Sequence, residues 1–411
     1  MNRRRQRPNW FRIILLVLLI AAGLYLDRFV IPSTPSPFEP TPTPTRAPES
    51  YITDAEELFK QGKLLQSIQA YQQAIAANPS EPTYYVDLAR VQVFNGDYKD
   101  AQTSAENALL LNPNNSMAHA RRAWALDFQG DYLAAETSIK EALRIDPNNA
   151  VAHAYYAEIL IDQGADTVQK AIDESNVAKA LAPDTLETHR ARGYILENTA
   201  NYEEAVREYQ AAIAINGNIS DLHMALGRNY RTLGIFDKAI EEFTRANALN
   251  PTDPEPDYLI SRTYVTVGEY VKAMQYAETA VKDRSADAKY IGNLGVMYYK
   301  NNLWPDAIKE LDLAINGGLT ADGLKVEPAQ LIPNSPRIAE YYFTYALVLA
   351  KSNRCGEALQ IARTINTRIP ADELSVSNAN EAVGICQQNL AAPPTSTQPS
   401  ATATLAVTPT P

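Results

Sequence analysis

Between residues 51 and 390 the sequence repeats itself at intervals of about 34 residues, and this periodicity leaves few possible folds. Pro79, Pro113 and Pro147 follow one another at this interval. Short segments with a helix breaker, an aromatic residue and a fixed alanine recur between them, as in NGDYKDA at 95–101. A repeat of this length forms one supersecondary unit, which must stack on its neighbours to bury a core. The sequence therefore predicts a solenoid.

Apolar positions within each repeat have helical spacing. Ala239, Phe243 and Ala246 are separated by four and three residues and share one helix face. Alanines there let two helices approach closely, while Phe243 fills the space between them. The pattern resembles the tetratricopeptide repeat family, whose units are pairs of antiparallel helices. The resemblance implies an all-α, right-handed superhelical solenoid of about nine helix-turn-helix repeats. Its expected parts are the repeats at 51–390, an insertion at 316–337 and a capping helix at 372–390.

The insertion is longer than a turn between repeats requires. Loops of this length in compact folds are often functional. Two interpretations stay open, namely a peripheral excursion packed on its own repeats and a lid or partner-binding loop.

The amino-terminal segment places arginines before an apolar run. The 22 residues from Trp10 to Ile31 would span roughly 30 Å as a helix. We therefore expect residues 1–31 to form a cytoplasmic amino terminus and a transmembrane signal-anchor of a bacterial type, with the repeats outside the cytoplasm. Cleavage after Gly23, as in a signal peptide, stays open. The Pro/Thr-rich segments 32–50 and 391–411 are expected to be an extended linker and a disordered tail.

Charge and motif content exclude several functions. The 37 Lys and Arg residues against 48 Asp and Glu give a net charge of −11, the wrong sign for nucleic acid. Phosphate loops, paired His–Glu metal motifs, nucleophile elbows and Cys-x-x-Cys are not found, so we expect no enzyme activity, metal or cofactor. The segment 251–258 alternates Asp253, Glu255 and Asp257, but has neither the glycine nor the twelfth acid of a calcium loop, and is predicted to be a turn.

The four histidines follow the repeat. His119, His153, His189 and His223 recur at the same interval, which is lengthened only between His153 and His189, where the fourth unit carries extra residues. All four therefore occupy one position of the unit. Helices that pack about 8–10 Å apart cannot bring these rings to one metal, whose bonds to nitrogen are about 2 Å. We predict a packing role.

The resemblance also implies a concave groove lined by the first helix of each unit. Its predicted residues are Arg90, Trp124, Asp127, Phe128, Glu158, Arg190, Tyr194, Arg228, Arg231, Tyr258, Arg262, Tyr299 and Lys300. Arginine suits carboxylates and tyrosine suits extended peptides, so protein or peptide partners with acidic segments are expected. The alternative is that these are ordinary solvated residues.

Two functions follow from this interpretation. The first is a membrane-tethered, non-enzymatic scaffold on the extracytoplasmic side that binds protein or peptide partners. The second is an accessory factor in envelope polysaccharide or polymer assembly or export. The sequence does not specify the partner.

Cys355 and Cys386 are the only cysteines. In an antiparallel stack the start of the second helix of the ninth unit and the end of the capping helix lie at one edge, so we expect the thiols to be neighbours. Such a pair outside the cytoplasm would be oxidised to a disulfide. Two separate buried thiols are the alternative.

Overall fold

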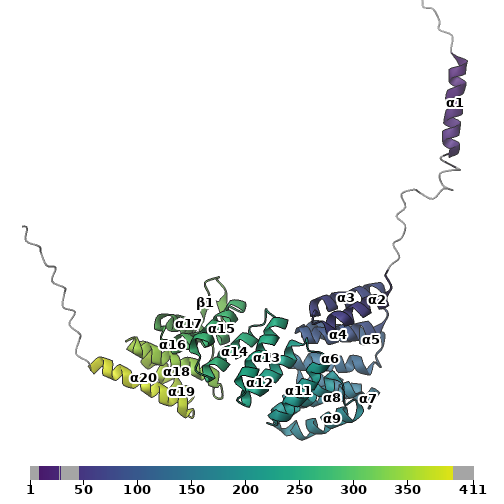
Figure 1. The fold of residues 1–411 in the computed structure, drawn as a ribbon. Coiled ribbons are helices and arrows are strands. Elements are labelled where there is room, and N and C mark those ends of the chain that lie inside the picture. The colour runs from purple at the N-terminus through teal and green to yellow at the C-terminus, as the bar shows by residue number, and fades with distance from the viewer. Residues whose placement is uncertain (1–8, 27, 29–45, 392–411) are drawn as a thin grey trace, which may run out of the picture.

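The structure is a computed structural model that describes residues 9–26, 28 and 46–391. From residue 46 onward, helices α2 to α19 form nine consecutive pairs, numbered here as units 1 to 9, and α20 packs on the last pair (Figure 1). The first helices of the units are α2 (Pro48–Lys60), α4 (Pro82–Asn95), α6 (Ser116–Phe128), α8 (Ala150–Gln163), α10 (Leu186–Asn198), α12 (Ser220–Thr232), α14 (Glu255–Thr266), α16 (Ala288–Lys300) and α18 (Pro336–Lys351). The second helices are α3 (Leu64–Ala77), α5 (Tyr98–Leu111), α7 (Tyr132–Ile145), α9 (Val168–Leu181), α11 (Tyr202–Ile215), α13 (Phe236–Leu249), α15 (Tyr270–Asp283), α17 (Trp304–Asn316) and α19 (Cys355–Arg368). The last helix is α20 (Glu373–Ala391), and a short 3-10 helix, η3 (Ala165–Thr167), lies between α8 and α9.

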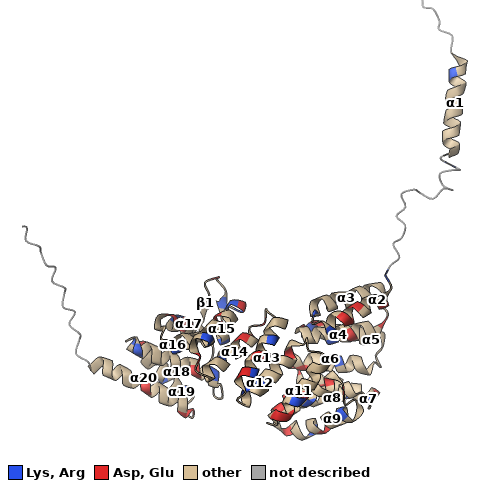
Figure 2. Cartoon of the chain, in the orientation of Figure 1, with Lys and Arg blue, Asp and Glu red and all other residues tan. Residues whose placement is uncertain are grey.

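This array agrees with the helical repeat solenoid that the sequence predicts. Acidic and basic residues are interspersed along it rather than separated into two halves (Figure 2). Oppositely charged side chains therefore lie close enough to form local ion pairs, such as Arg245 with Glu241.

The turn between the two helices of a unit needs a left-handed backbone. Gly96 ends α4 with a φ of 87°, and its amide donates to the carbonyl of Val93 at 3.0 Å. Glycine adopts this conformation without steric cost. The recurring breaker in the sequence is thus the residue that reverses the chain.

Close contact between paired helices depends on small residues. A Cβ atom added to Gly227 would lie 2.6 Å from the ring of Phe243, which is fully buried. The same relation holds between Gly193 and Tyr209, at 2.8 Å. The aromatic ring of the second helix therefore occupies the space that glycine leaves on the first helix, as the periodicity predicts.

The insertion between units 8 and 9 forms a small hairpin. Strands β1 (Gly318–Leu319) and β2 (Lys325–Val326) pair antiparallel, with Gly318 opposite Val326. The Ala329 amide donates to the carbonyl of Ala314 at 2.8 Å, which ties the segment to α17. Val326 and Leu331 are buried, so the insertion packs on its own repeats.

The predicted transmembrane helix is wrong. Helix α1 (Trp10–Tyr25) has 16 residues. At 1.5 Å per residue it is about 24 Å long, shorter than a hydrocarbon core of about 30 Å. Across the residues that the structure describes, no helix combines the length and apolar character needed to span a bilayer. The remaining parts of the predicted anchor, and most of the linker and tail, lie outside the described residues, at 1–8, 27, 29–45 and 392–411. The end of the predicted linker is helical, because α2 begins at Pro48, and Ala391 is the last residue of α20.

Candidate functional site

The predicted groove residues all lie on first helices, and first helices of neighbouring units contact one another along much of the array. Their exposure differs from the expectation of an open groove. Six are buried, namely Trp124, Asp127, Glu158, Arg190, Tyr258 and Arg262. Five are half-buried, namely Arg90, Tyr194, Arg228, Arg231 and Tyr299, while Phe128 and Lys300 are exposed.

Two features account for this burial. Tyr258 and Arg262, on α14, are covered by the following units, where they contact Tyr290 and Glu340. In the amino-terminal half, the units curl until unit 1 meets units 5 and 6. The Asn218 side-chain amide donates to the carbonyl of Lys60 at 2.7 Å, and Asn216 donates to the carbonyl of Phe59 at 3.4 Å. Gly62 permits this approach, since an added Cβ would lie 2.8 Å from Asn218. We call this contact the ring closure. It brings the inner faces of units 2 and 5 against each other.

Carboxylates of the chain neutralise the buried arginines across the ring. Glu187 on α10 pairs with Arg90 at 2.9 Å and with Arg121 at 3.5 Å. Burial raises the pKa of Glu187, but the two arginines lower it more, so the net shift is downward. Arg190 pairs with Glu158 and Asp221; burial lowers the pKa of Arg190, but the two carboxylates together raise it more. The arginines of this half are therefore not free to bind a partner.

Six of the predicted residues line one polar cavity of about 160 Å³, which we call the inner pocket. They are Asp127, Phe128, Glu158, Arg190, Tyr194 and Arg228, joined by Asp162, Tyr209, Asp221 and Ala225. Burial, followed by the charges of Asp162 and Glu158, raises the pKa of Asp127 to about 9. Asp127 is therefore protonated at neutral pH.

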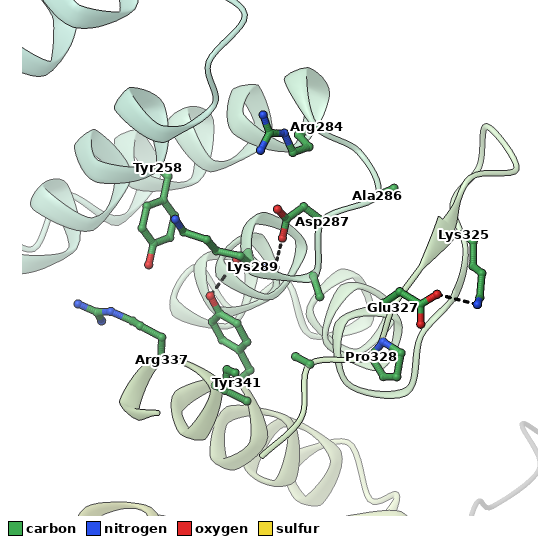
Figure 3. A pocket seen from close by; sticks show the side chains of 13 residues that line it. Tyr258, Arg284, Ala286, Asp287, Lys289, Lys325, Glu327, Pro328, Arg337 and Tyr341 are labelled. Carbon is green, nitrogen blue, oxygen red and sulfur yellow. Dashed lines mark hydrogen bonds and ion pairs between the residues drawn. The ribbon is translucent and has the colours of Figure 1, made fainter. Parts of the chain in front are cut away.

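A second, larger cavity of about 800 Å³ lies between the insertion and units 7 to 9, and we call it the insertion cavity (Figure 3). Its walls include the rings of Tyr258 and Tyr341 and the small apolar residues Ala286, Ala288, Pro328, Ala329 and Ile338. The Tyr341 hydroxyl donates to the carbonyl of Lys289 at 2.8 Å, which fixes α18 against α16. Figure 3 shows Arg284, Lys289 and Arg337 spread around Tyr258, with Lys325 and Glu327 across the cavity on the insertion.

An arginine cluster adjoins this cavity. Arg262 and Arg337 share the carboxylate of Glu340, at 3.0 and 3.2 Å. Within the described part of the chain the Arg231 side chain makes no ion pair or hydrogen bond. Its pKa is lowered, mainly by burial and then by the positive charges of Arg337 and Arg262. One carboxylate therefore serves three neighbouring arginines, and the cluster retains uncompensated positive charge.

The histidines brace the units, as predicted. His153 Nδ1 lies 2.6 Å from Glu174 on the second helix of its unit, and its Nε2 lies 2.9 Å from the carbonyl of Pro147. His223 has the corresponding contacts with Glu242 and Gly217. Both partners of the His153 ring only accept hydrogen bonds, so both of its ring nitrogens donate, and these contacts raise its pKa despite burial.

The acidic segment that begins at Pro251 caps a helix. Asp253 accepts a hydrogen bond from the Glu255 amide at 3.0 Å, and Asp257 accepts one from Asn247 at 3.0 Å. In the described chain no group of three or more His, Cys, Asp or Glu side chains is placed to hold a metal ion.

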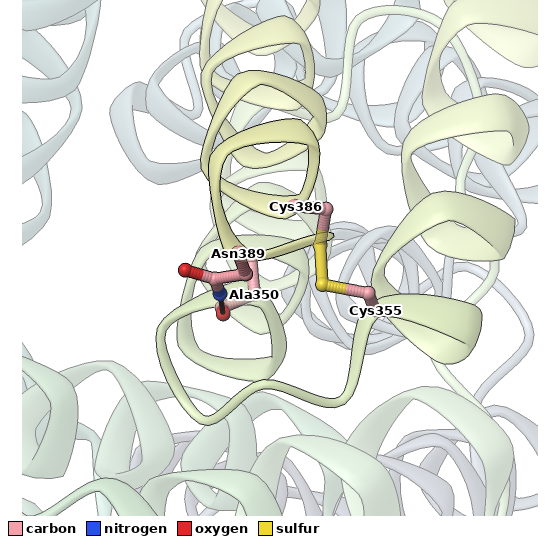
Figure 4. The surroundings of a disulfide bond; sticks show 4 residues. All are labelled: Ala350, Cys355, Cys386 and Asn389. Atoms are coloured by element: carbon pink, nitrogen blue, oxygen red, sulfur yellow. Dashed lines mark hydrogen bonds between the residues drawn. A yellow bond between two sulfur atoms is a disulfide. The ribbon is translucent and has the colours of Figure 1, made fainter. Parts of the chain in front are cut away.

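Cys355, at the start of α19, and Cys386, on α20, form a disulfide with their Cα atoms 5.4 Å apart (Figure 4). Beside it, the Asn389 side chain donates to the carbonyl of Ala350 at 3.0 Å. Together these bonds hold the last helix on unit 9.

Several site residues are absent from the sequence-based set. Glu187 and Asp221 lie three and seven residues before Arg190 and Arg228 on the same helices, spacings that share a helix face, so a signal for them existed. Asp162 lies four residues after the predicted residue Glu158 on α8, so it had a signal as well. Arg121 had none, because its pairing with Glu187 depends on the ring closure. Arg337 is the last residue of the predicted insertion, where the repeat pattern is interrupted.

Comparisons with known proteins concern the fold. The family profile "Tetratricopeptide repeat" matches residues 53–93, 86–150 and 190–254. No curated protein matches significantly. Among solved structures, a chain of the APC/C hetero-tetramer Cut9–Hcn1 aligns with a TM-score of 0.49 and 13% identity, over 69% of this chain and 52% of that one. This chain thus spans about half the length of that protein. Pseudomonas aeruginosa pilF aligns with a TM-score of 0.44 and 20% identity, over 55% and 96% of the two chains. PilW, described as a type IV pilus biogenesis factor, aligns with a TM-score of 0.44 and 22% identity, over 48% and 90%.

Proposed function

Because this chain belongs to the tetratricopeptide repeat family, we propose that it is a non-enzymatic scaffold that binds an extended segment of a partner protein. The binding site in this proposal is the insertion cavity together with the adjoining arginine cluster. The partner segment carries an apolar side chain and at least one carboxylate.

The observation that carries the proposal is the combination of an apolar cavity with unneutralised arginines. A cavity of about 800 Å³ has room for several side chains of a bound peptide. Arg231 makes no ion pair among the described residues, and Arg284, on the cavity wall, makes none either. A carboxylate of the partner supplies the charge that the cluster lacks, and guanidinium groups bind carboxylates through paired hydrogen bonds.

The proposal places the repeats in an oxidising compartment outside the cytoplasm. Its support is the disulfide between Cys355 and Cys386, since structural disulfides persist in oxidising compartments and are rare in the cytosol. Mass analysis of unreduced peptides from the native protein tests it, because two free thiols would contradict this placement.

Site-directed photo-crosslinking in the native cell tests the binding site. The crosslinking amino acid p-benzoylphenylalanine replaces Ala286 on the cavity wall, and a matched control replaces Glu203, which is exposed on α11. Position 286 should yield a protein adduct that is lost when Arg231→Glu and Arg337→Glu are combined. The adduct should also decrease as salt rises, because exposed charge pairs are screened.

Three outcomes decide between the functions. Equal adducts at positions 203 and 286 would show that the cavity is not the binding site. Adducts that survive the double charge reversal would remove the arginine cluster from the proposal. A protease-resistant carbohydrate adduct at position 286 would favour the role in polymer assembly instead.

A further inference from the structure

The inner pocket contains two buried carboxylate oxygens without a hydrogen-bond donor. Asp127 is 6% exposed; its Oδ1 atom has no N–H or O–H donor within reach, while a hydrogen bond with the Asp162 carboxyl helps to keep it protonated. Glu158 is 3% exposed; its Oε2 atom accepts from Trp124 and Arg190, but its Oε1 atom has no partner. Buried polar atoms are rarely left unpaired, because each costs about 1–3 kcal/mol. Both residues belong to the lining of this pocket.

The charges around these atoms do not balance. The lining contains four carboxyl groups and two guanidinium groups, namely Asp127, Glu158, Asp162 and Asp221 with Arg190 and Arg228. Arg190 already pairs with Glu158 and, at 3.1 Å, with Asp221. Arg228 pairs with Glu197, outside the lining, at 3.1 Å. Asp127 and Asp162 therefore have no positive partner within the described residues.

A ligand that complements these groups donates several hydrogen bonds, accepts none and carries a positive charge. A primary ammonium meets all three conditions, because it has three N–H donors and no acceptor. A metal ion does not, since the described carboxylates do not converge on a point that could hold one. We propose that the inner pocket binds a primary ammonium group, which donates to Asp127 Oδ1 and Glu158 Oε1.

The size and opening of the pocket suit an alkyl ammonium. Its volume of about 160 Å³ equals that of roughly five water molecules in the liquid, close to the four carbons and one nitrogen of a lysine side chain. Asp221 and Arg228 form the entrance, with side chains 46% and 36% exposed. The alkyl stem would pass between them and beside Phe128, which lines the pocket.

Binding exchanges a cation for a proton. Asp127 holds a proton at neutral pH because burial and then the charges of Asp162 and Glu158 raise its pKa to about 9. The ammonium enters, Asp127 loses its proton to the solvent, and the total charge of the pocket is unchanged. Below pH 9 the affinity should therefore rise about tenfold per pH unit, while the amine itself stays protonated. The other titratable groups facing the site are Glu158, Asp162, Arg190, Tyr194, Tyr209, Asp221 and Arg228.

Isothermal titration calorimetry on the full chain tests the proposal between pH 6 and pH 8. The probes are putrescine, Nα-acetyl-lysine methylamide, whose side-chain ammonium is free, and the uncharged Nα-acetylnorleucine methylamide. The two ammonium probes should bind, the norleucine probe should not, and each binding event should release about one proton at pH 7. If the lysine probe binds at least tenfold more tightly than putrescine, the ligand is a lysine side chain of a protein. If putrescine binds at least tenfold more tightly than the lysine probe, the ligand is a free diamine.

Asp127→Asn keeps the shape of the side chain and removes its charge. The ammonium affinity should fall at least tenfold in this variant and should lose its dependence on pH. Asp237→Asn, an exposed position on α13, is the matched control and should bind as the unmodified chain does. The proposal is overturned if no ammonium probe binds the unmodified chain, if Asp127→Asn binds equally well, or if binding releases no proton. The pH series on the unmodified chain decides the question even if the variant unfolds.

Discussion

Replacing Glu187 by glutamine should open the ring closure. Glu187 is 7% exposed and is the only carboxylate that pairs with Arg90 and Arg121 among the described residues. Glutamine preserves the volume but leaves the two guanidinium groups without an ion-pair partner, with Asp87 as the nearby remaining carboxyl. Removing one member of a buried ion pair costs about 3–5 kcal/mol. The lower end applies here, because the Arg90 side chain is 27% exposed and can regain water.

Urea unfolding followed by the fluorescence of Trp124 measures this effect. Trp124 lies 5.1 Å from the Arg190 guanidinium inside the ring, so its emission reports local opening. Trp10 and Trp304, the other two tryptophans, are replaced by phenylalanine in every sample. Glu187→Gln should lower the free energy of opening by about 3 kcal/mol and enlarge the particle in small-angle X-ray scattering.

Glu241→Gln is the matched control. It also removes one carboxylate from an arginine, but the Glu241–Arg245 pair is more than half exposed on both sides. Such pairs contribute within about 0.5 kcal/mol. Equal shifts in the two variants would refute the claim that Glu187 holds the ring closed. The difference between the two variants should also fade at low pH. Because the pKa of Glu187 is lowered in the folded chain, its ion pairs contribute their full stability above about pH 4.3 and lose it as pH falls through the folded pKa.

Three further outcomes are expected. Burial lowers the pKa of His153, but contacts with Glu174 and a backbone carbonyl raise it more. The stability that His153 contributes is therefore complete below about pH 6.5 and is lost as pH rises through its folded pKa. Over this pH range the unfolding temperature of the unmodified chain should fall more than that of His153→Gln. Gly227→Ala should destabilise the chain by about 1–2 kcal/mol, because an overlap with the ring of Phe243 outweighs a helix-propensity gain of about 1 kcal/mol. Gly384→Ala is the control: an added Cβ there meets nothing within 4 Å, so this change should slow amide hydrogen exchange in α20. Reducing the disulfide, which closes a separation of 31 residues, should cost roughly 3–4 kcal/mol and first raise exchange in α20.

The periodic parts of this structure could be predicted from sequence because they depend on contacts between neighbouring helices. Gly227 and Phe243 lie on the two helices of one unit, and the same pairing joins Gly193 to Tyr209 in the unit before, so the pattern reports it. The histidine braces are local in the same way. Helix α1 was predicted too long, because a count of apolar residues does not say where the helix ends.

The closed inner face could not be predicted in this way. Asn218 and Lys60 are 158 residues apart, and their contact depends on how much each unit rotates relative to the last. Small differences in that rotation accumulate over five units and decide whether Arg90 faces solvent or Glu187. The residue types on the inner face were visible in the sequence, but their burial was not.

The two halves of the inner face consequently have different capacities for binding. Around the ring, Arg90, Arg121 and Arg190 are paired with carboxylates of the chain, so a partner could use them only by displacing those groups. Beside the insertion cavity, Arg231 has no partner among the described residues, and an incoming carboxylate displaces nothing. A partner that binds the insertion cavity should therefore depend strongly on salt without opening the ring. Salt-insensitive capture that requires ring opening would instead place the partner on the inner face of units 2 to 5.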